Sequence, residues 1–166
     1  EDILGEGAAR DLLKQPLGYG WTDGRPDLRA NIASWYPGAS AANVLVTNGS
    51  SEATMIALMA LFESGDSLVF ALPNFMQIDG LGRALGFDIR RLELSGDTDW
   101  QIDPAHLNKV AAGAKAIAVT NPANPTGSVL SAASRAALIE AAKRNDSWLM
   151  VDEIYRGGEI DGAETE

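Results

Sequence analysis

The feature that most constrains this chain is its alternation of short β-rich runs with stretches of helical pattern. Several of the β-rich runs are almost continuous in apolar residues, which favours strands of a parallel sheet covered on both faces. We expect strands at Val44–Thr47, Ser67–Leu72, Phe87–Leu94, Ala116–Thr120 and Trp148–Asp152. We expect helices at Ser51–Glu63, Met76–Leu85, Pro104–Ala111 and Ser131–Arg144. Strand-helix alternation at this spacing predicts an α/β fold, a three-layer αβα arrangement with a mostly parallel sheet.

Composition excludes several kinds of site. The 166 residues contain no cysteine, so disulfides and thiolate chemistry are excluded. His106 is the single histidine, which leaves too few ligands for a histidine-based metal site or triad. A formal charge of −10 disfavours a surface that follows nucleic-acid phosphates. A small anion pocket built from backbone amides stays compatible with that charge.

No segment has the pattern of a membrane span or a secretory signal. The longest apolar run, Ala53–Phe62, is interrupted by Thr54 and is far shorter than the roughly 18 residues that a span needs. We interpret it as a buried helix. The first residues lack a basic start and an apolar run, although an internal start would hide a signal. We expect a cytoplasmic protein. The polar stretch 157–166 follows a strand without a closing element, so we expect the chain to stop mid-fold.

Ligands of open α/β sheets collect at the carboxyl ends of the strands, where four segments stand out. The first is 47–52, Thr-Asn-Gly-Ser-Ser-Glu. Gly49 would let the backbone approach a ligand, and Ser50 or Ser51 would cap the following helix. Free amides and the helix dipole would then favour a phosphate. The competing interpretation is an ordinary helix cap with Glu52 in its first turn.

The second segment is Leu72-Pro73-Asn74-Phe75, which places an aromatic ring directly after a strand. Such a ring can stack on a planar heterocycle, or it can simply be a core or lid aromatic.

The third segment, 121–127, carries two Asn-Pro pairs, which disfavour helix and central strand and impose a stiff turn. A rigid turn can present an asparagine amide at a fixed point, or it can be only a turn.

The fourth segment, 148–155, ends an apolar strand with Asp152, and Tyr155 follows three residues later. A carboxylate at the end of a buried strand needs a partner, such as a protonated ring nitrogen. The alternative is an aspartate that caps the next helix.

Taken together, these segments resemble the class I/II aminotransferases, which are fold-type I pyridoxal-phosphate enzymes, over nearly the whole chain. The most specific motifs are Asn124-Pro125-Thr126-Gly127 and Asp152-x-x-Tyr155. Tyr19, followed by 24–29 (Gly-Arg-Pro-Asp-Leu-Arg) and Tyr36, is similar to the family's Tyr…Gly-x-Pro-x-Leu-Arg segment. The resemblance implies that residues 1–166 are part of the large cofactor-binding domain of the aspartate-aminotransferase-like fold, in truncated form.

The resemblance implies that pyridoxal 5'-phosphate is the cofactor and that the first two segments bind it. The amides and hydroxyls of Gly49, Ser50 and Ser51 would hold the cofactor phosphate. Phe75 would stack on the pyridine ring. Tyr19 would reach the phosphate of the neighbouring subunit's cofactor, which implies a homodimer with shared active sites.

The same resemblance makes Asp152 and Tyr155 the expected catalytic residues. Asp152 would pair with the pyridinium nitrogen, and a buried carboxylate there keeps that nitrogen protonated, as the electron sink requires. Asn124 and Tyr155 would hydrogen-bond the phenolic oxygen of the ring.

Several features of the family have no counterpart in these 166 residues. The Schiff-base lysine lies downstream of the Asp-x-x-Tyr motif, and the carboxylate-binding arginine and the small domain lie further on. The glycine-containing segment that usually precedes the first helix is also missing. Lysines are present elsewhere, but none matches the family's motif: Lys14, Lys109, Lys115 and Lys143. We therefore expect a longer parent protein, or a fragment that is inactive by itself.

The first expected function is transfer of an amino group between an amino acid and a 2-oxo acid. A second is another reaction at Cα, Cβ or Cγ, such as decarboxylation, elimination or cyclisation. A third is the effector-sensing domain of a transcription regulator, with any nucleic-acid contact outside this region. A dinucleotide site at 18–24 is rejected, because no strand precedes these glycines and their spacing is wrong.

Overall fold

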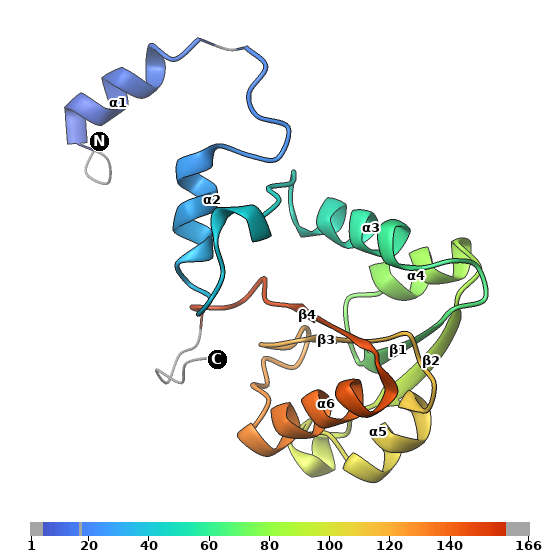
Figure 1. Cartoon of the computed structure of the whole chain (residues 1–166). Coiled ribbons are helices and arrows are strands. Elements are labelled where there is room, and N and C mark those ends of the chain that lie inside the picture. Colours follow the sequence, from blue (N-terminus) through green and yellow to red (C-terminus); the bar gives the residue numbers. More distant parts are fainter. Residues whose placement is uncertain (1–4, 17, 159–166) are drawn as a thin grey trace. The chain divides into compact units, whose positions relative to one another are not determined.

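The computed structural model describes residues 5–16 and 18–158, and the chain divides into two compact units, 1–47 and 48–166. Unit 1 contains α1 (Gly5–Leu13), α2 (Pro26–Ala33) and the 3-10 helix η1 (Ala41–Asn43) (Figure 1). Proline at the first position of α2 suits a helix start, because its missing N–H has no partner there in any helix. The expectation that residues 1–166 form part of one large domain stays a prediction.

Arg29 of α2 connects this helix to the segments on either side of it in the sequence. Its Nε donates to the carbonyl oxygens of Ala41 at 3.0 Å and Val44 at 2.9 Å, and its Nη1 pairs with Asp23. Gly24 has φ +102°, and a Cβ at this position would lie 2.4 Å from a methyl carbon of Val46. The Gly-x-Pro-x-Leu-Arg segment is thus explained in part by local structure.

The strand expected at Val44–Thr47 is wrong. These residues form a loop after η1, and no described strand pairs with them. Isolated hydrogen bonds connect these residues to the rest of unit 1. For example, the Val46 amide donates to the carbonyl oxygen of Asp23 at 3.1 Å, and Arg29 donates to the carbonyl oxygen of Val44. A short run of β-favouring residues forms a strand only where a neighbouring strand supplies backbone hydrogen-bond partners.

Unit 2 contains a parallel sheet, as predicted. In its described residues the sheet has four strands in the order β2-β1-β3-β4. These are β1 (Ser67–Leu72), β2 (Asp88–Glu93), β3 (Ala116–Thr120) and β4 (Trp148–Asp152). The helices are α3 (Ser50–Leu61), α4 (Gln77–Ala84), the 3-10 helix η2 (Gly96–Thr98), α5 (Pro104–Ala111) and α6 (Ala132–Asn145). The expected helix bounds are confirmed to within about two residues.

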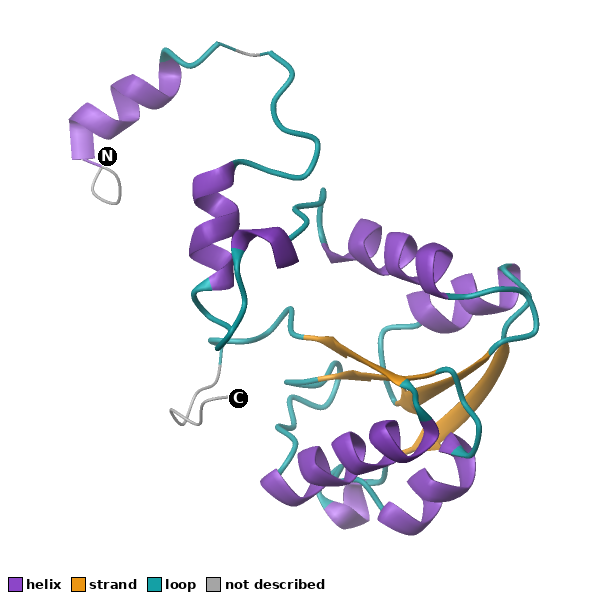
Figure 2. Cartoon of the chain, viewed as in Figure 1, coloured by secondary structure: helices purple, strands orange, loops and turns teal. Residues whose placement is uncertain are grey.

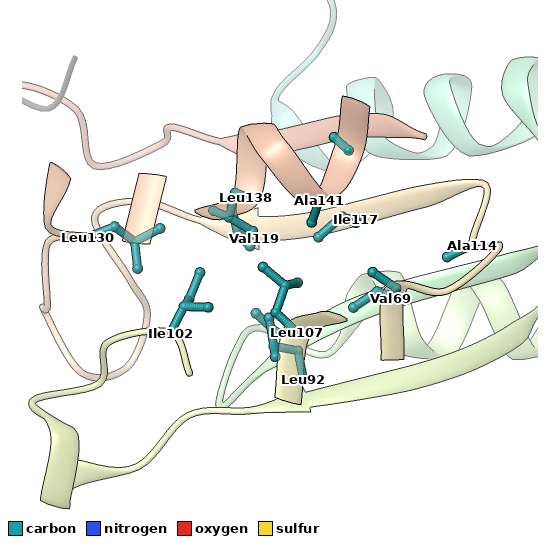
Figure 3. Packing of buried hydrophobic residues seen from close by; sticks show 13 residues of the cluster. Val69, Leu92, Ile102, Leu107, Ala114, Ile117, Val119, Leu130, Leu138 and Ala141 are labelled. Atoms are coloured by element: carbon teal, nitrogen blue, oxygen red, sulfur yellow. The ribbon is translucent and has the colours of Figure 1, made fainter. Parts of the chain in front are cut away.

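Two apolar clusters cover the two faces of this sheet. On one face α5 and α6 pack over Val69, Ile117 and their neighbours (Figure 3). On the other face α3 and α4 pack over Phe70 and Ala118. Alternate residues of β1 and β3 therefore enter opposite clusters, and both strands are buried on both sides. Figure 2 shows the helices on either side of the strands, which confirms the three-layer αβα arrangement.

Two expectations about burial are wrong. α3 forms where the apolar run predicted a helix, but only Leu58 within it is buried, and Met55 and Met59 are exposed. One stripe of an α-helix suffices to contact a sheet, so an apolar run need not be buried all round. β4 exposes Val151, because it lies at the edge of the described sheet. None of the described helices has the length and apolar character to cross a membrane.

Candidate active site

The strand-end segments of unit 2 lie along one edge of the sheet. All described strands are parallel, so the residues that follow β1, β3 and β4 emerge at the same edge. Phe75, Asn124 and Asp152 are, respectively, after β1, after β3 and at the end of β4. α3 packs on the sheet and leads directly into β1, so the helix and the strand run in opposite directions. The first turn of α3 therefore lies at the same edge as the carboxyl end of β1.

Three hydrogen bonds connect neighbouring segments along this edge. Gln77 Nε2, at the start of α4, donates to the carbonyl oxygen of Ser51 at 2.9 Å. Thr120 Oγ1, at the end of β3, donates to Asn74 Oδ1 at 2.8 Å. The Asn121 amide donates to the carbonyl oxygen of Asp152 at 3.0 Å. Through residues within these segments or directly adjacent to them in unit 2, these bonds connect the first turn of α3, the loop after β1, the end of β3 and the end of β4 in one series.

The turn before α3 is capped differently from the expectation. Gly49, with φ +94°, is the N-cap, and neither Ser50 nor Ser51 caps the helix, because both lie inside its first turn. Glu52 instead accepts from the Asn48 amide at 2.5 Å and from Asn48 Nδ2 at 3.2 Å. Both serines are exposed. The first amides of a helix have no carbonyl partner within it, so this turn has the chemistry of a phosphate site.

Phe75 is not a core residue. The residue is 59% exposed, and it belongs to neither apolar cluster. Its backbone amide donates to Asn74 Oδ1 at 2.7 Å. An exposed aromatic ring on a hydrogen-bonded loop is available to stack on a planar ligand.

The two Asn-Pro pairs of the loop after β3 have different surroundings. Asn121 is buried, and its Oδ1 accepts from the Leu130 amide at 2.9 Å, which closes the loop. Asn124 instead lines a hollow of about 960 Å³, together with Tyr155 and Arg156. The Leu72-Pro73, Asn121-Pro122 and Asn124-Pro125 peptide bonds are cis. The first asparagine therefore serves the turn, and the second lines a site.

Asp152 and Tyr155 lie in a turn that follows β4. Asp152 is partly buried, and its Oδ1 accepts from the Ile154 amide at 3.1 Å. Residues 154–157 form turns, so Asp152 caps no described helix. Tyr155 is exposed and lines the same hollow as Asn124. Asp152, Phe75 and the 49–51 turn do not line this hollow. Their connection to the residues that line it is the series of hydrogen bonds described above.

Tyr19 belongs to unit 1 and is fully exposed. Within that unit it lines a second hollow with Trp21 and Arg25. Its expected role toward a neighbouring subunit stays a prediction.

The sequence pattern did not reveal the residues that connect the segments. Asn74, Gln77, Thr120 and Asn121 are polar residues adjacent to the expected site residues. The available signal was their place at strand ends and helix starts, where side chains often bond to nearby backbone. That signal does not say which distant segment each side chain reaches.

Comparison with known proteins identifies the family. A family model described as aminotransferase class I and II matches residues 8–165. The chain belongs to this family. Pyridoxal phosphate is the cofactor of the family, which confirms that part of the expectation.

Three relatives illustrate the breadth of the similarity. The chain is 30% identical to a valine–pyruvate aminotransferase of Mycobacterium tuberculosis, over 94% of this chain and 42% of that protein. It is 26% identical to a solved alanine aminotransferase of Pyrococcus furiosus, with a TM-score of 0.90 over 100% of this chain and 44% of the other. It is 34% identical to a PLP-dependent cyclase, OrfR, with a TM-score of 0.77 over 86% of this chain and 38% of that chain. The chain thus spans about two fifths of the length of these relatives.

Proposed function

We propose that the protein carrying this chain is a pyridoxal-phosphate-dependent aminotransferase. It would move an amino group between an amino acid and a 2-oxo acid. The observation that carries the proposal is the hydrogen-bonded series of strand-end segments at one edge of the sheet. These segments are the same ones that carry the motifs on which the resemblance to the family rests.

The first turn of α3 fits a phosphate monoester. Gly49 has a left-handed backbone conformation, and a Cβ there would meet no heavy atom within 4 Å. A ligand can therefore approach the turn closely. Neither the Ser50 nor the Ser51 hydroxyl caps the helix, and both would donate to a bound phosphate. The positive end of the helix dipole adds a favourable interaction with a dianion.

The other segments fit a flat, polar ring. When bound, pyridoxal phosphate supplies an electron sink for the carbanion that forms as the substrate Cα loses a bond. Phe75 would hold the ring plane, and the Asp152 carboxylate would keep a proton on the ring nitrogen. Asn124 and Tyr155 would donate to the phenolic oxygen. Their shared hollow supports a common target for these two side chains.

The proposal includes a second subunit and a place in the cell. Tyr19 would contact the cofactor phosphate of a partner, which makes the active protein a homodimer with shared sites. Its complete exposure within unit 1 supports a contact beyond its own unit. We also propose a cytoplasmic location and amino acid and 2-oxo acid substrates. The lysine that bonds the cofactor and the small domain would come from sequence outside residues 1–166.

The test uses the full-length protein loaded with pyridoxal phosphate. A panel of amino acids is added, first alone and then with pyruvate or 2-oxoglutarate. We expect some amino acid to convert the cofactor to its aminated form, and an oxo acid to restore it with formation of a new amino acid. Cofactor binding with no amino transfer across the panel would contradict the proposal.

A cyclisation or related reaction is a second candidate, because the chain is 34% identical to a PLP-dependent cyclase over 86% of its length. The same panel separates the two functions. A cyclase would consume its amino acid without need of an oxo acid, and the absorbance of the cofactor would return unaided. Dependence of turnover on an oxo acid would exclude this candidate.

A further inference from the structure

We propose that Asn74 and Gln77 are positioning residues that fix Phe75 between β3 and the first turn of α3. The inference rests on the proposed function, since it gives Phe75 a ligand to face. The two side chains anchor the segment 74–77 at both of its ends.

The first anchor is the Asn74 carboxamide oxygen. It accepts from Thr120 Oγ1 at 2.8 Å and from the Phe75 amide at 2.7 Å. A carboxamide oxygen has two lone pairs, so a single atom joins the end of β3 to the backbone of the aromatic residue. Thr120 is buried, with 7% of its surface exposed. A buried hydroxyl on a central strand is a fixed reference point, because its alternatives to this bond are few.

The second anchor is Gln77, the first residue of α4. Its Nε2 donates to the carbonyl oxygen of Ser51 at 2.9 Å, across 26 residues of sequence. Ser51 belongs to the turn that we assign to the cofactor phosphate. The stacking residue and the phosphate turn are therefore joined through Gln77, although they lie on different helices and loops.

Packing does not supply the same constraint on Phe75. Phe75 is 59% exposed and lies outside both apolar clusters. A side chain with few packing contacts takes its direction from its backbone. A ring that must select one plane for a cofactor needs that backbone held, because small misplacements reduce rates strongly. The two anchors provide this hold.

The test compares Thr120→Val with Thr120→Ser in the full-length protein. Valine removes the hydroxyl donor at nearly constant volume, whereas serine keeps it. Hydrogen exchange of the Phe75 amide is measured without cofactor, and the dissociation constant and circular dichroism of pyridoxal phosphate are then measured with it. For Thr120→Val we expect exchange about 10-fold faster and cofactor binding about 10-fold weaker, the effect of one lost hydrogen bond. Thr120→Ser should keep the exchange rate of the Phe75 amide, the cofactor affinity and the circular dichroism of the bound cofactor close to those of the wild type.

Gln77→Leu tests the other anchor and also serves if Thr120→Val does not fold. It should weaken cofactor binding by a similar factor and accelerate exchange across residues 74–77. Unchanged exchange and affinity in both variants would overturn the inference. If the wild-type protein binds no cofactor, the proposed function fails, and the exchange measured without cofactor still decides whether the anchors hold Phe75.

Discussion

The backbone amide of Asn121 donates to the carbonyl oxygen of Asp152 at 3.0 Å, one residue beyond the last paired residue of β3. This bond extends the β3–β4 ladder into the loop that carries Asn124. The start of that loop and the start of the Asp152–Tyr155 turn are therefore fixed side by side. Asn124 and Asp152, which are proposed to act on opposite sides of one ring, therefore follow backbone segments that are hydrogen-bonded to each other.

The first prediction concerns Asp152. In the full-length enzyme, Asp152→Ala should lower kcat on the order of 100-fold or more, the size expected when one preorganised charge at the reacting group is lost. The dissociation constant of the cofactor should change much less, because the phosphate turn and Phe75 remain. Steady-state kinetics and a cofactor titration measure the two quantities. Equal losses in both would contradict the role of Asp152 at the ring nitrogen.

The second prediction concerns the phosphate turn. Ser50→Ala combined with Ser51→Ala should weaken cofactor binding about 10-fold to 100-fold, since bonds to a charged group contribute about 1.5–3 kcal/mol. Thermal stability should hardly change, because neither hydroxyl caps α3. Cofactor titration and thermal melting report the two effects.

Ser131→Ala is the matched control for these serines. Ser131 caps α6, and its hydroxyl accepts from the Ser134 amide at 3.1 Å. Its loss should destabilise the protein by about 1 kcal/mol and leave cofactor affinity intact. A cofactor affinity that is unchanged in the Ser50/Ser51 variant would remove these serines from the phosphate site.

The buried strands and the helices were predictable because their patterns are strong. β1 and β3 are short apolar runs with breakers at each side, and α5 begins at Pro104, as a proline-led start predicts. The Val44–Thr47 run is also apolar and rich in β-favouring residues, yet it forms a loop. The composition of a segment indicates whether it can adopt a strand conformation. Whether it forms a strand depends on a neighbouring strand, which the local sequence does not specify.

The order of site segments was predictable from the strand-end rule, but their connections were not. Asn121 and Asn124 look equivalent in sequence, because each precedes a proline. The structure shows that Asn121 is buried and accepts from the Leu130 amide, whereas Asn124 lines the hollow. The capping role of Gly49 was missed for a similar reason. Ser50 has the better capping propensity, but Gly49 supplies the left-handed backbone at the turn.

The third prediction concerns the close approach at Gly24. Gly24→Ala should destabilise unit 1 for two reasons. A positive φ costs an alanine about 1–2 kcal/mol. The new Cβ would also lie 2.4 Å from Val46, and such overpacking adds about 1–3 kcal/mol. Gly38→Ala is the control, because Gly38 has φ +82° with no heavy atom near the position of a Cβ. Urea unfolding should rank the variants; equal losses would mean that the Val46 contact relaxes freely.

The fourth prediction concerns acid stability and Asp66. Its pKa lies below the usual 3.8, first because the Glu63 amide donates to the carboxylate and then because Lys115 bonds it, with burial opposing both. The two bonds measure 2.7 Å and 2.6 Å. A lowered folded-state pKa gives stability that is complete above pH 3.8 and is lost as the pH falls through the lowered value. The urea midpoint of wild type should therefore fall between pH 5 and pH 2.5, and Asp66→Asn should reduce that fall. Lys115→Met should reduce it less, because it removes the hydrogen bond and the charge of Lys115 but leaves the Glu63 amide, the largest single cause, in place. If Lys115→Met flattened the profile as much as Asp66→Asn, the backbone bond would not be the main cause.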